Sequence, residues 1–518
     1  MRFTAEKINA RLAELWPLRF WERRPLALQW QPGRLAQARP DAWQPAPIGT
    51  VWDGPGRWAA FRATVEAPAA WAGKPVALRL RLANYRAGDP DAPACDPQAL
   101  LYVDGHPVYG LDMFHDEVVL TGAATSGQSW EISIDAEAGI QSPHSPTLLV
   151  AEVGALDQNA VDLYYDTQVA LDSALLLPEN DYRRGRMLKV IDEAMLRVDW
   201  RGPLGDAFRA SLVEADRYLR EKLYEAMTAG FTPTVIATGH SHIDVAWLWT
   251  LAQVREKCAR TFSTSLRLME QYPEYRYIQS QPQLYQFTQQ DYPEIFAGIR
   301  QRVAEGRWEP LGCTWVEMDC NLSGGESLVR QFLFGTRYFR KAFGTDGTRV
   351  LWLPDVFGYP ASLPQIMARS GCPYFCTAKL TWNEYNRLPY DSFRWRGIDG
   401  TEVVSHLITI PALYWRPKVG TPISSYDAML TPGELTGAWE RYRQKDVHEE
   451  LLITFGHGDG GGGSKPEMVE RAQRLADLPG IPRLRHGRVA DFFAGLARVA
   501  DRLPVWNGEL YFEYHRGT

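Results

Sequence analysis

The sequence predicts a multidomain protein with an N-terminal β-sandwich, a helical connector, and an α/β domain built on an irregular parallel β/α barrel of about seven strands. Three patterns support this fold class. Apolar residues alternate with period two from about 51 to 170, recur at helical spacing from 175 to 230, and form alternating strands and helices from 232 onwards. A chain of 518 residues is also too long for a single core.

The N-terminal region begins with one amphipathic helix and continues as short strands. Residues 77–82 and 130–135 alternate between apolar and polar side chains, and Asp104-Gly105 separates two apolar runs, which indicates a hairpin. Many strands without intervening helices are typical of a β-sandwich. Such a domain either binds a sugar or has a structural role beside the next domain. Because the sequence shows no aromatic platform for a sugar, the structural role is favoured.

The helical connector contains two expected helices, 187–198 and 207–227, the second ended by Gly230 and Pro233. Beyond it, the candidate strands are 234–239, 275–280, 307–313, 349–354, 374–378, 402–408 and 451–455. The candidate helices are 251–271, 283–305, 325–343, 362–370 and 433–445. This alternation predicts a parallel sheet with right-handed crossovers. The expected domain boundaries are 1–174, 175–231, 232–500 and 501–518, the last beginning a following segment.

Composition excludes several functional classes. A net charge of −6 gives no basic surface for nucleic acid, and no apolar run is long enough to cross a membrane. The N-terminal segment lacks the apolar centre of a secretory signal. Six scattered cysteines form no disulfide framework, and Cys372 and Cys376 are interpreted as buried thiols. These features predict a cytoplasmic location, and they leave a homo-oligomer open.

Polar residues follow several of the predicted strands. His242 and Asp244 come directly after strand 234–239, and in extended chain two residues of this spacing project to the same side. An imidazole nitrogen and a carboxylate oxygen directed at one point form half of a metal site. Both residues could instead cap the next helix, but the neighbouring Trp247 and Trp249 favour a functional role.

Asp355 is the second candidate. It follows an apolar strand and lies in a turn formed with Pro354 and Gly358. A carboxylate in this position must be solvated, paired or bound to metal. The alternative, a helix N-cap, fits less well because the next helix is expected to begin near Ser362.

The third candidate is Asp459, which precedes four successive glycines, 460–463. Glycines allow the backbone to approach a ligand closely, and the absence of a following Gly-Lys-Ser/Thr argues against a phosphate loop. A flexible linker is the alternative reading. An acid in this setting suits a proton donor. His515, alone in an aromatic context, is interpreted as a metal ligand only together with the other three residues.

Four segments together resemble glycoside hydrolase family 38, the retaining α-mannosidases, most closely the cytosolic or vacuolar branch. These segments are 240–244, 317–327, 352–358 and 509–518. The resemblance covers 232–518 strongly and the N-terminal region weakly. It implies that the zinc ligands are His242, Asp244, Asp355 and His515. Family members usually continue beyond the last motif, so the resemblance also implies a chain without the C-terminal domains.

The same resemblance implies further roles. Asp355 corresponds to the catalytic nucleophile and Asp459 to the general acid/base, while Trp247 and Phe357 line the subsite for the terminal mannose. We add His457 and Asp319 as candidate substrate-binding residues. Asp319 is also the reserve candidate for the general acid. The alternative for Asp319 is a group that hydrogen-bonds a metal ligand and orients it.

The function implied is a metal-dependent exo-α-mannosidase that acts through a covalent mannosyl-enzyme on oligosaccharides ending in α-linked mannose. It would use one divalent metal, zinc in the first place, with cobalt also compatible with these ligands. Two alternatives stay open at this point. One is a metal-dependent carbohydrate deacetylase, in which the metal activates water and no covalent intermediate forms. The other is an inactive mannose-binding fragment.

Overall fold

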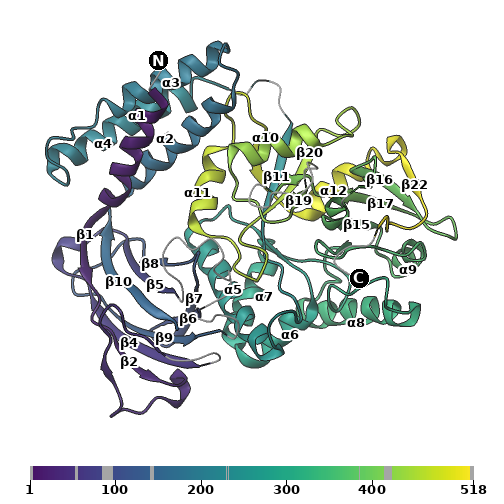
Figure 1. Ribbon diagram of the computed structural model, residues 1–518, viewed down its shortest axis with the longest axis horizontal. Coiled ribbons are helices and arrows are strands. Elements are labelled where there is room, and N and C mark those ends of the chain that lie inside the picture. The colour runs from purple at the N-terminus through teal and green to yellow at the C-terminus, as the bar shows by residue number, and fades with distance from the viewer. Residues whose placement is uncertain are drawn as a thin grey trace. The chain divides into compact units, whose positions relative to one another are not determined.

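The computed structural model describes residues 4–52, 57–83, 97–139, 145–228, 230, 233–383, 385–412 and 423–513 (Figure 1). The chain divides into two compact units. The first comprises Met1–Thr228 together with Ala259–Arg267, and the second comprises Ala229–Cys258 together with Leu268–Thr518. No helix in the described ranges is both long and apolar enough to span a bilayer.

The first unit contains two antiparallel sheets around one core. One sheet has the order β1 (Phe20–Pro25), β10 (Thr147–Leu156), β5 (Val76–Ala83) and β8 (Glu117–Thr121). The other has the order β3 (Gln44–Pro45), β2 (Gln29–Pro32), β4 (Trp58–Glu66), β9 (Ser129–Glu137), β6 (Gln98–Val103) and β7 (His106–Leu111). Alternate residues such as Leu78 and Leu80 on β5 and Ile132 and Ile134 on β9 are buried in the shared core, as the period-two pattern predicts. The hairpin at Asp104-Gly105 joins β6 and β7.

Four helices complete the first unit and pack against one another (Figure 1). They are α1 (Thr4–Leu15), α2 (Gln158–Leu176), α3 (Tyr182–Met195) and α4 (Asp206–Leu219). Helix α2 corrects the sequence prediction, which extended the β pattern to about residue 170. Its N-terminus is capped by the Asp157 side chain, which accepts a hydrogen bond from the backbone N–H of Asn159. The predicted period of two therefore ends with β10.

The second unit contains a parallel sheet that carries the first two candidate ligands. Its order is β13 (Trp308–Pro310), β12 (Tyr277–Gln279), β11 (Thr234–His240) and β20 (Glu450–Phe455), and β21 (Arg483–His486) also pairs with β11. All of these pairings are parallel. The carboxyl ends of β11 and β20 therefore meet at one edge of the sheet, where ligands collect in α/β folds.

Five further strands of this unit form a second, mixed sheet, and β18 (Ile410–Pro411) pairs separately with β19 (Ser424–Ser425). The order of the mixed sheet is β14 (Val350–Trp352), β15 (Tyr374–Thr377), β17 (Glu402–Leu407), β16 (Ser392–Arg396) and β22 (Val505–Asn507). Strands β16 and β17 run antiparallel, and a parallel bridge between Leu311 and Thr348 links the regions beside β13 and β14. Within the described residues there are thus two five-stranded sheets, and the predicted barrel of about seven parallel strands is not confirmed.

Helices lie between the strands of the second unit, as the alternating pattern predicts. They are α5 (Leu251–Gln271), α6 (Pro282–Asp291), α7 (Pro293–Ala304), α8 (Gly325–Phe343), α9 (Leu363–Arg369), α10 (Pro432–Arg441), α11 (Pro466–Arg474) and α12 (Val489–Ala497). The single helix expected over 283–305 is two helices, because Pro293 has no N–H to continue the first and starts the second. Five elements of this unit were not predicted from the sequence: α11, α12, β16, β21 and β22.

Candidate metal centre

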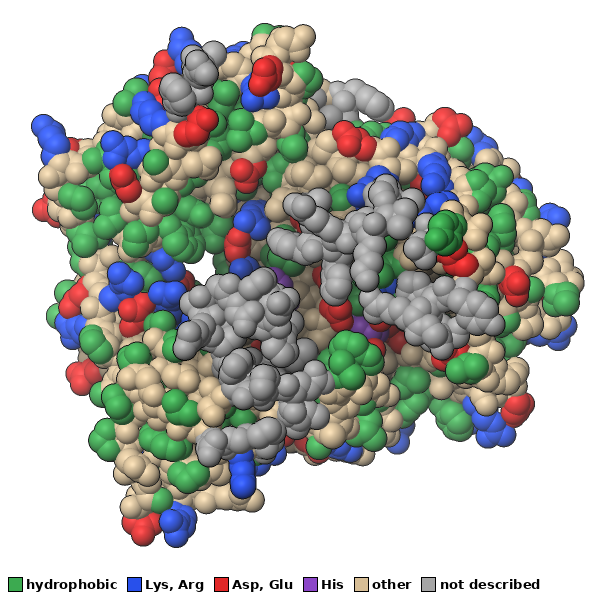
Figure 2. Space-filling view, viewed as in Figure 1, with side chains coloured by type: hydrophobic (Ala, Val, Ile, Leu, Met, Phe, Trp, Pro, Cys, Tyr) green, Lys and Arg blue, Asp and Glu red, His purple; other side chains and the backbone are tan. Residues whose placement is uncertain are grey.

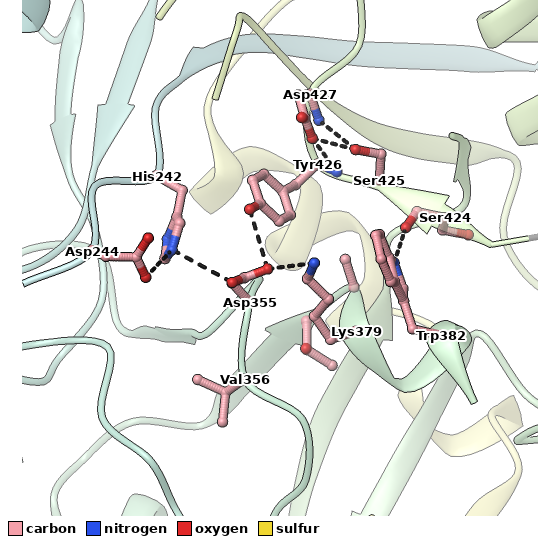
Figure 3. A network of polar contacts seen from close by, with 12 residues as sticks. His242, Asp244, Asp355, Val356, Lys379, Trp382, Ser424, Ser425, Tyr426 and Asp427 are labelled. Carbon is pink, nitrogen blue, oxygen red and sulfur yellow. Dashed lines mark hydrogen bonds and ion pairs between the residues drawn. The ribbon is translucent and has the colours of Figure 1, made fainter. Parts of the chain in front are cut away.

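The candidate ligands His242, Asp244 and Asp355 lie together in the second unit (Figure 3). His242 and Asp244 follow β11, and Asp355 follows β14. One side-chain nitrogen or oxygen from each of the three lies within 4.8 Å of the others. Figure 2 shows acidic and histidine side chains gathered in a recess of this unit. Side chains that follow two different strands therefore lie close enough together to share one ion.

The two histidines of the His240-Ser241-His242 motif have different surroundings. His240 is fully buried, and its Nε2 accepts a hydrogen bond of 3.2 Å from the indole N–H of Trp352. Burial, followed by the charge of His242, lowers the pKa of His240 to about 3, so this ring is neutral. His242 instead directs Nε2 toward Asp244 Oδ1 at 3.1 Å and Asp355 Oδ2 at 3.7 Å. Only His242 is placed as a ligand.

Glu317 contacts the ring nitrogen of His242 that faces away from the cluster. Its Oε2 lies 2.8 Å from His242 Nδ1, although off the ideal hydrogen-bond direction, and its Oε1 accepts a hydrogen bond of 2.6 Å from the Ser280 hydroxyl. Both Glu317 and His242 are almost completely buried. A carboxylate at Nδ1 directs the Nε2 lone pair at the cluster, which is how metal-binding histidines are oriented.

Substitution of Glu317 tests this arrangement. We expect Glu317→Ala to weaken metal affinity by about 10- to 100-fold, because the imidazole loses the carboxylate that fixes its tautomer and orientation. Competition with a chelator, read by metal analysis, measures the change. Glu326→Gln on the exposed N-terminal end of α8 is the matched control. Unchanged affinity in the Ala variant would show that Glu317 has no such role.

Asp355 is held through one of its two carboxylate oxygens. Lys379 Nζ lies 2.6 Å from Oδ1, and the Tyr426 hydroxyl donates a 3.2 Å hydrogen bond to the same atom (Figure 3). The other oxygen, Oδ2, is the one that faces His242. The loop backbone is fixed by the Tyr359 hydroxyl, which lies within 3.0 Å of the Leu353 and Val356 carbonyl oxygens.

The glycine-rich segment forms a closed loop next to this cluster. His457 and Gly463 exchange two backbone hydrogen bonds of 2.7 and 2.9 Å, and the N–H of His242 donates to the Gly458 carbonyl at 2.9 Å. Gly456 has φ of +139°, and a Cβ there would lie 2.6 Å from the His240 carbonyl oxygen. The segment is therefore a closed turn bound to the loop after β11, rather than an extended linker.

Asp459 lies in this loop and keeps contact with solvent. The surrounding protein partly desolvates its carboxyl, and this effect, followed by the negative charge of Asp355, raises the pKa of Asp459 above its ordinary value. Nearby Asp427 is raised further, to a pKa of about 6, chiefly by burial. Carboxyl groups with raised pKa values beside an ion-paired carboxylate are the combination that acid catalysis requires.

The donor set fits a divalent cation. Burial opposes protonation of His242, but the charges of Glu317 and Asp244 outweigh it and raise the pKa of the imidazole well above its ordinary value. Asp244 and Glu317 therefore place enough negative charge here to hold a proton on a buried ring. A cation would take the place of that proton, since metal ligation requires the neutral imidazole. One nitrogen and carboxylate oxygens suit zinc or cobalt.

The other predicted site residues are placed as follows. Trp247 is 58% exposed, with its ring 5.5 Å from that of Trp249, and Phe357 is half-buried with its ring 5.5 Å from Lys379 Nζ. His457 is half-buried in the glycine loop. Asp319 is exposed, and its carboxylate accepts hydrogen bonds from the two backbone N–H groups of Asn321 and Leu322. The substrate-binding roles of these residues stay predictions.

His515 lies outside the described residues. The segment just before it is placed beside the Asp355 loop: Leu510 pairs with Tyr359 through two backbone hydrogen bonds, and a Cβ on Gly358 would lie 2.3 Å from the Tyr511 ring. Glu513 accepts hydrogen bonds from the backbone N–H of Tyr385 and the side chain of Asn386. His515 as fourth ligand therefore stays a prediction.

Sequence analysis assigned no role to Glu317, Lys379, Tyr426 and Asp427. Lys379 carried a weak signal, because it is a charged residue directly after a predicted apolar strand, 374–378. Tyr426 and Asp427 follow a short strand, β19 (Ser424–Ser425), with no recognisable pattern. The contact of Tyr426 with Asp355 depends on tertiary structure alone.

Comparisons with known proteins identify the family of this chain. Residues 232–509 match the model of the glycosyl hydrolases family 38 N-terminal domain, more than half of the chain. "Alpha-mannosidase G" of Dictyostelium discoideum is 33% identical over 81% of this chain and 38% of its own length. "Alpha-mannosidase 2C1" of Homo sapiens is 31% identical over 92% of this chain and 44% of its own.

A crystal structure of an alpha-mannosidase from Enterococcus faecalis V583 aligns with 54% of this chain and 31% of its own, with 20% identity and a TM-score of 0.41. The chain thus spans less than half the length of the relatives it matches here. His242, Asp244, Asp355 and Asp459 all lie within the range matched by the family model. The chain belongs to glycosyl hydrolase family 38.

Proposed function

We propose that this chain carries the catalytic site of a retaining, metal-dependent exo-α-mannosidase. The observation that carries the proposal is the meeting of His242, Asp244 and Asp355 beside a second carboxyl group, Asp459, whose pKa is raised. Retaining glycosidases need a nucleophilic carboxylate and a protonated carboxyl group at one site. The family match and relatives named alpha-mannosidases support α-linked mannose as the substrate.

The carboxyl groups of Asp355 and Asp459 have different roles in the two steps of the reaction. In the first step, an Asp355 oxygen bonds to the anomeric carbon while the glycosidic bond breaks and Asp459 gives its proton to the departing oxygen. In the second step, Asp459 takes a proton from water, the water oxygen bonds to the anomeric carbon, and the bond to Asp355 breaks. Two inversions give retention. Lys379 and Tyr426 hold Asp355 during both steps.

His242, Asp244 and Asp355 would hold the cation, with His515 as the predicted fourth ligand. When bound, a divalent cation supplies a Lewis acid that binds neighbouring sugar hydroxyls and stabilises charge on the ring. Zinc is the first candidate and cobalt the second. Oligosaccharides ending in α-mannose and a cytoplasmic location belong to the same proposal, and the location rests on the sequence alone.

The test is metal analysis of the purified chain beside hydrolysis of a chromogenic α-mannoside. We expect about one metal per chain, loss of release after treatment with chelator, and recovery when zinc or cobalt is added. A chromogenic β-mannoside is the matched control substrate and should not be hydrolysed.

Other outcomes separate the alternatives. Metal without hydrolysis, but with saturable binding of mannose, would indicate an inactive mannose-binding protein. Metal-dependent release of acetate from an acetylated sugar, without cleavage of the mannoside, would indicate a deacetylase. Hydrolysis that persists in the metal-free chain would contradict the metal dependence.

A further inference from the structure

Lys379 contacts the proposed nucleophile, although no role for it was predicted from the sequence. It begins a short 3₁₀ helix, Lys379–Trp382, directly after β15, and its side chain is almost completely buried. A buried ammonium group is costly unless it is paired. Its partner is Asp355 Oδ1 at 2.6 Å, and its Nζ lies 3.7 Å from the centre of the Trp382 ring. The lysine is thus fixed between one carboxylate and one aromatic face.

The surrounding chain holds Lys379 and Tyr426 as one support. The Trp382 indole N–H donates a 2.8 Å hydrogen bond to the Ser424 carbonyl (Figure 3). The Ser424 N–H donates one of 3.0 Å to the Thr381 hydroxyl. These bonds join the short helix after β15 to the segment that carries Tyr426. Lys379 and Tyr426 consequently donate to the same oxygen of Asp355 from two segments that are hydrogen-bonded to each other.

We propose that Lys379, assisted by Tyr426, is a positioning residue that fixes the plane of the Asp355 carboxylate and stabilises its negative charge. Holding Oδ1 from one side leaves Oδ2 directed at His242. This inference rests on the proposed function for its kinetic consequence. When the bond between Asp355 and the anomeric carbon breaks, the electron pair returns to the carboxylate, and a fixed ammonium group 2.6 Å away favours that departure.

The test compares Lys379→Met, Lys379→Arg and Tyr426→Phe with the unchanged chain. We expect Lys379→Met to lower kcat by about 100-fold without raising KM, because a preorganised charge is lost at the reacting carboxylate. Lys379→Arg keeps the positive charge, so its kcat should be at least about tenfold higher than that of Lys379→Met. Tyr426→Phe should lower kcat by about tenfold. The double variant Lys379→Met/Tyr426→Phe should lose less kcat than the product of the two single losses, since both groups hold the same oxygen of Asp355.

A second measurement is independent of mannoside hydrolysis. In crystal structures, the Asp355 carboxylate should change its orientation in Lys379→Met and keep it in Lys379→Arg. Lys341→Met, at an exposed position near the C-terminal end of α8, is the matched control and should change neither kinetics nor the carboxylate. Equal metal content and equal unfolding midpoints among the variants separate positioning from loss of the fold.

The inference requires both results. A kcat for Lys379→Met within about threefold of the unchanged chain, a loss that appears only as a higher KM, or a carboxylate that does not move would overturn it. If the unchanged chain binds metal and hydrolyses no α-mannoside, the proposed function fails, while the crystal structures alone decide whether Lys379 positions Asp355.

Discussion

Replacing Asp355 by asparagine is expected to abolish hydrolysis of α-mannosides, with kcat lowered by at least about 1,000-fold. The amide cannot form the mannosyl ester, and it also removes a charged ligand oxygen from the cluster with His242 and Asp244. Metal affinity should therefore fall together with activity. Steady-state kinetics and metal analysis of the same preparation measure both effects.

A covalent trap identifies the nucleophile directly. In a fluorinated mannosyl donor, the fluorine slows both steps and a good leaving group keeps the first one fast, so the intermediate accumulates and adds the mass of one fluorinated mannosyl residue to the chain. Peptide mapping should place that mass on Asp355. Asp446→Asn, at an exposed position, is the matched control and should label like the unchanged chain. Full activity of Asp355→Asn, or a label on another carboxylate, would remove Asp355 from this role.

The strand-end residues of the site could be predicted because the strands before them, β11 and β14, have recognisable apolar patterns. Strand β11 and helices α5 and α8 occur where the apolar spacing predicts them, and α5 has a capping box between Thr250 and Gln253. Asp244 and Asp355 then follow from their positions directly after apolar strands. Such local patterns carry their information over a few residues.

The supporting residues could not be predicted in this way. Glu317 contacts a histidine 75 positions earlier, and the contact of Tyr426 with Asp355 spans 71 positions. Neither contact leaves a spacing that the sequence alone displays. Strand β16 was missed for a different reason. Its charged residues Arg394 and Arg396 are typical of a loop in the sequence, but in the sheet they form ion pairs with Glu402 on β17.

Replacing Asp459 by asparagine is expected to give a different kinetic result from the Asp355 variant. Metal content should stay unchanged, because Asp459 is not in the ligand cluster. Hydrolysis of a mannoside with a poor leaving group should fall by about 100- to 10,000-fold, since the departing oxygen receives no proton. A substrate with an activated leaving group needs no acid in the first step and should still form the mannosyl-enzyme. Added azide should then release it as the glycosyl azide, because azide attacks without a general base.

The pH dependence of the unchanged chain follows from the same carboxyl group. Asp459 must be protonated to act as the acid, and its pKa is raised by partial desolvation and by Asp355. Activity should consequently extend above the pKa of an ordinary aspartate and decline as the pH rises through the raised value. This basic decline in kcat/KM should be absent from Asp459→Asn with the activated substrate, and present in the control Asp501→Asn, which changes an exposed residue. A decline that persists in Asp459→Asn would assign the acid to another group, with Asp427 the first to examine because burial raises its pKa to about 6.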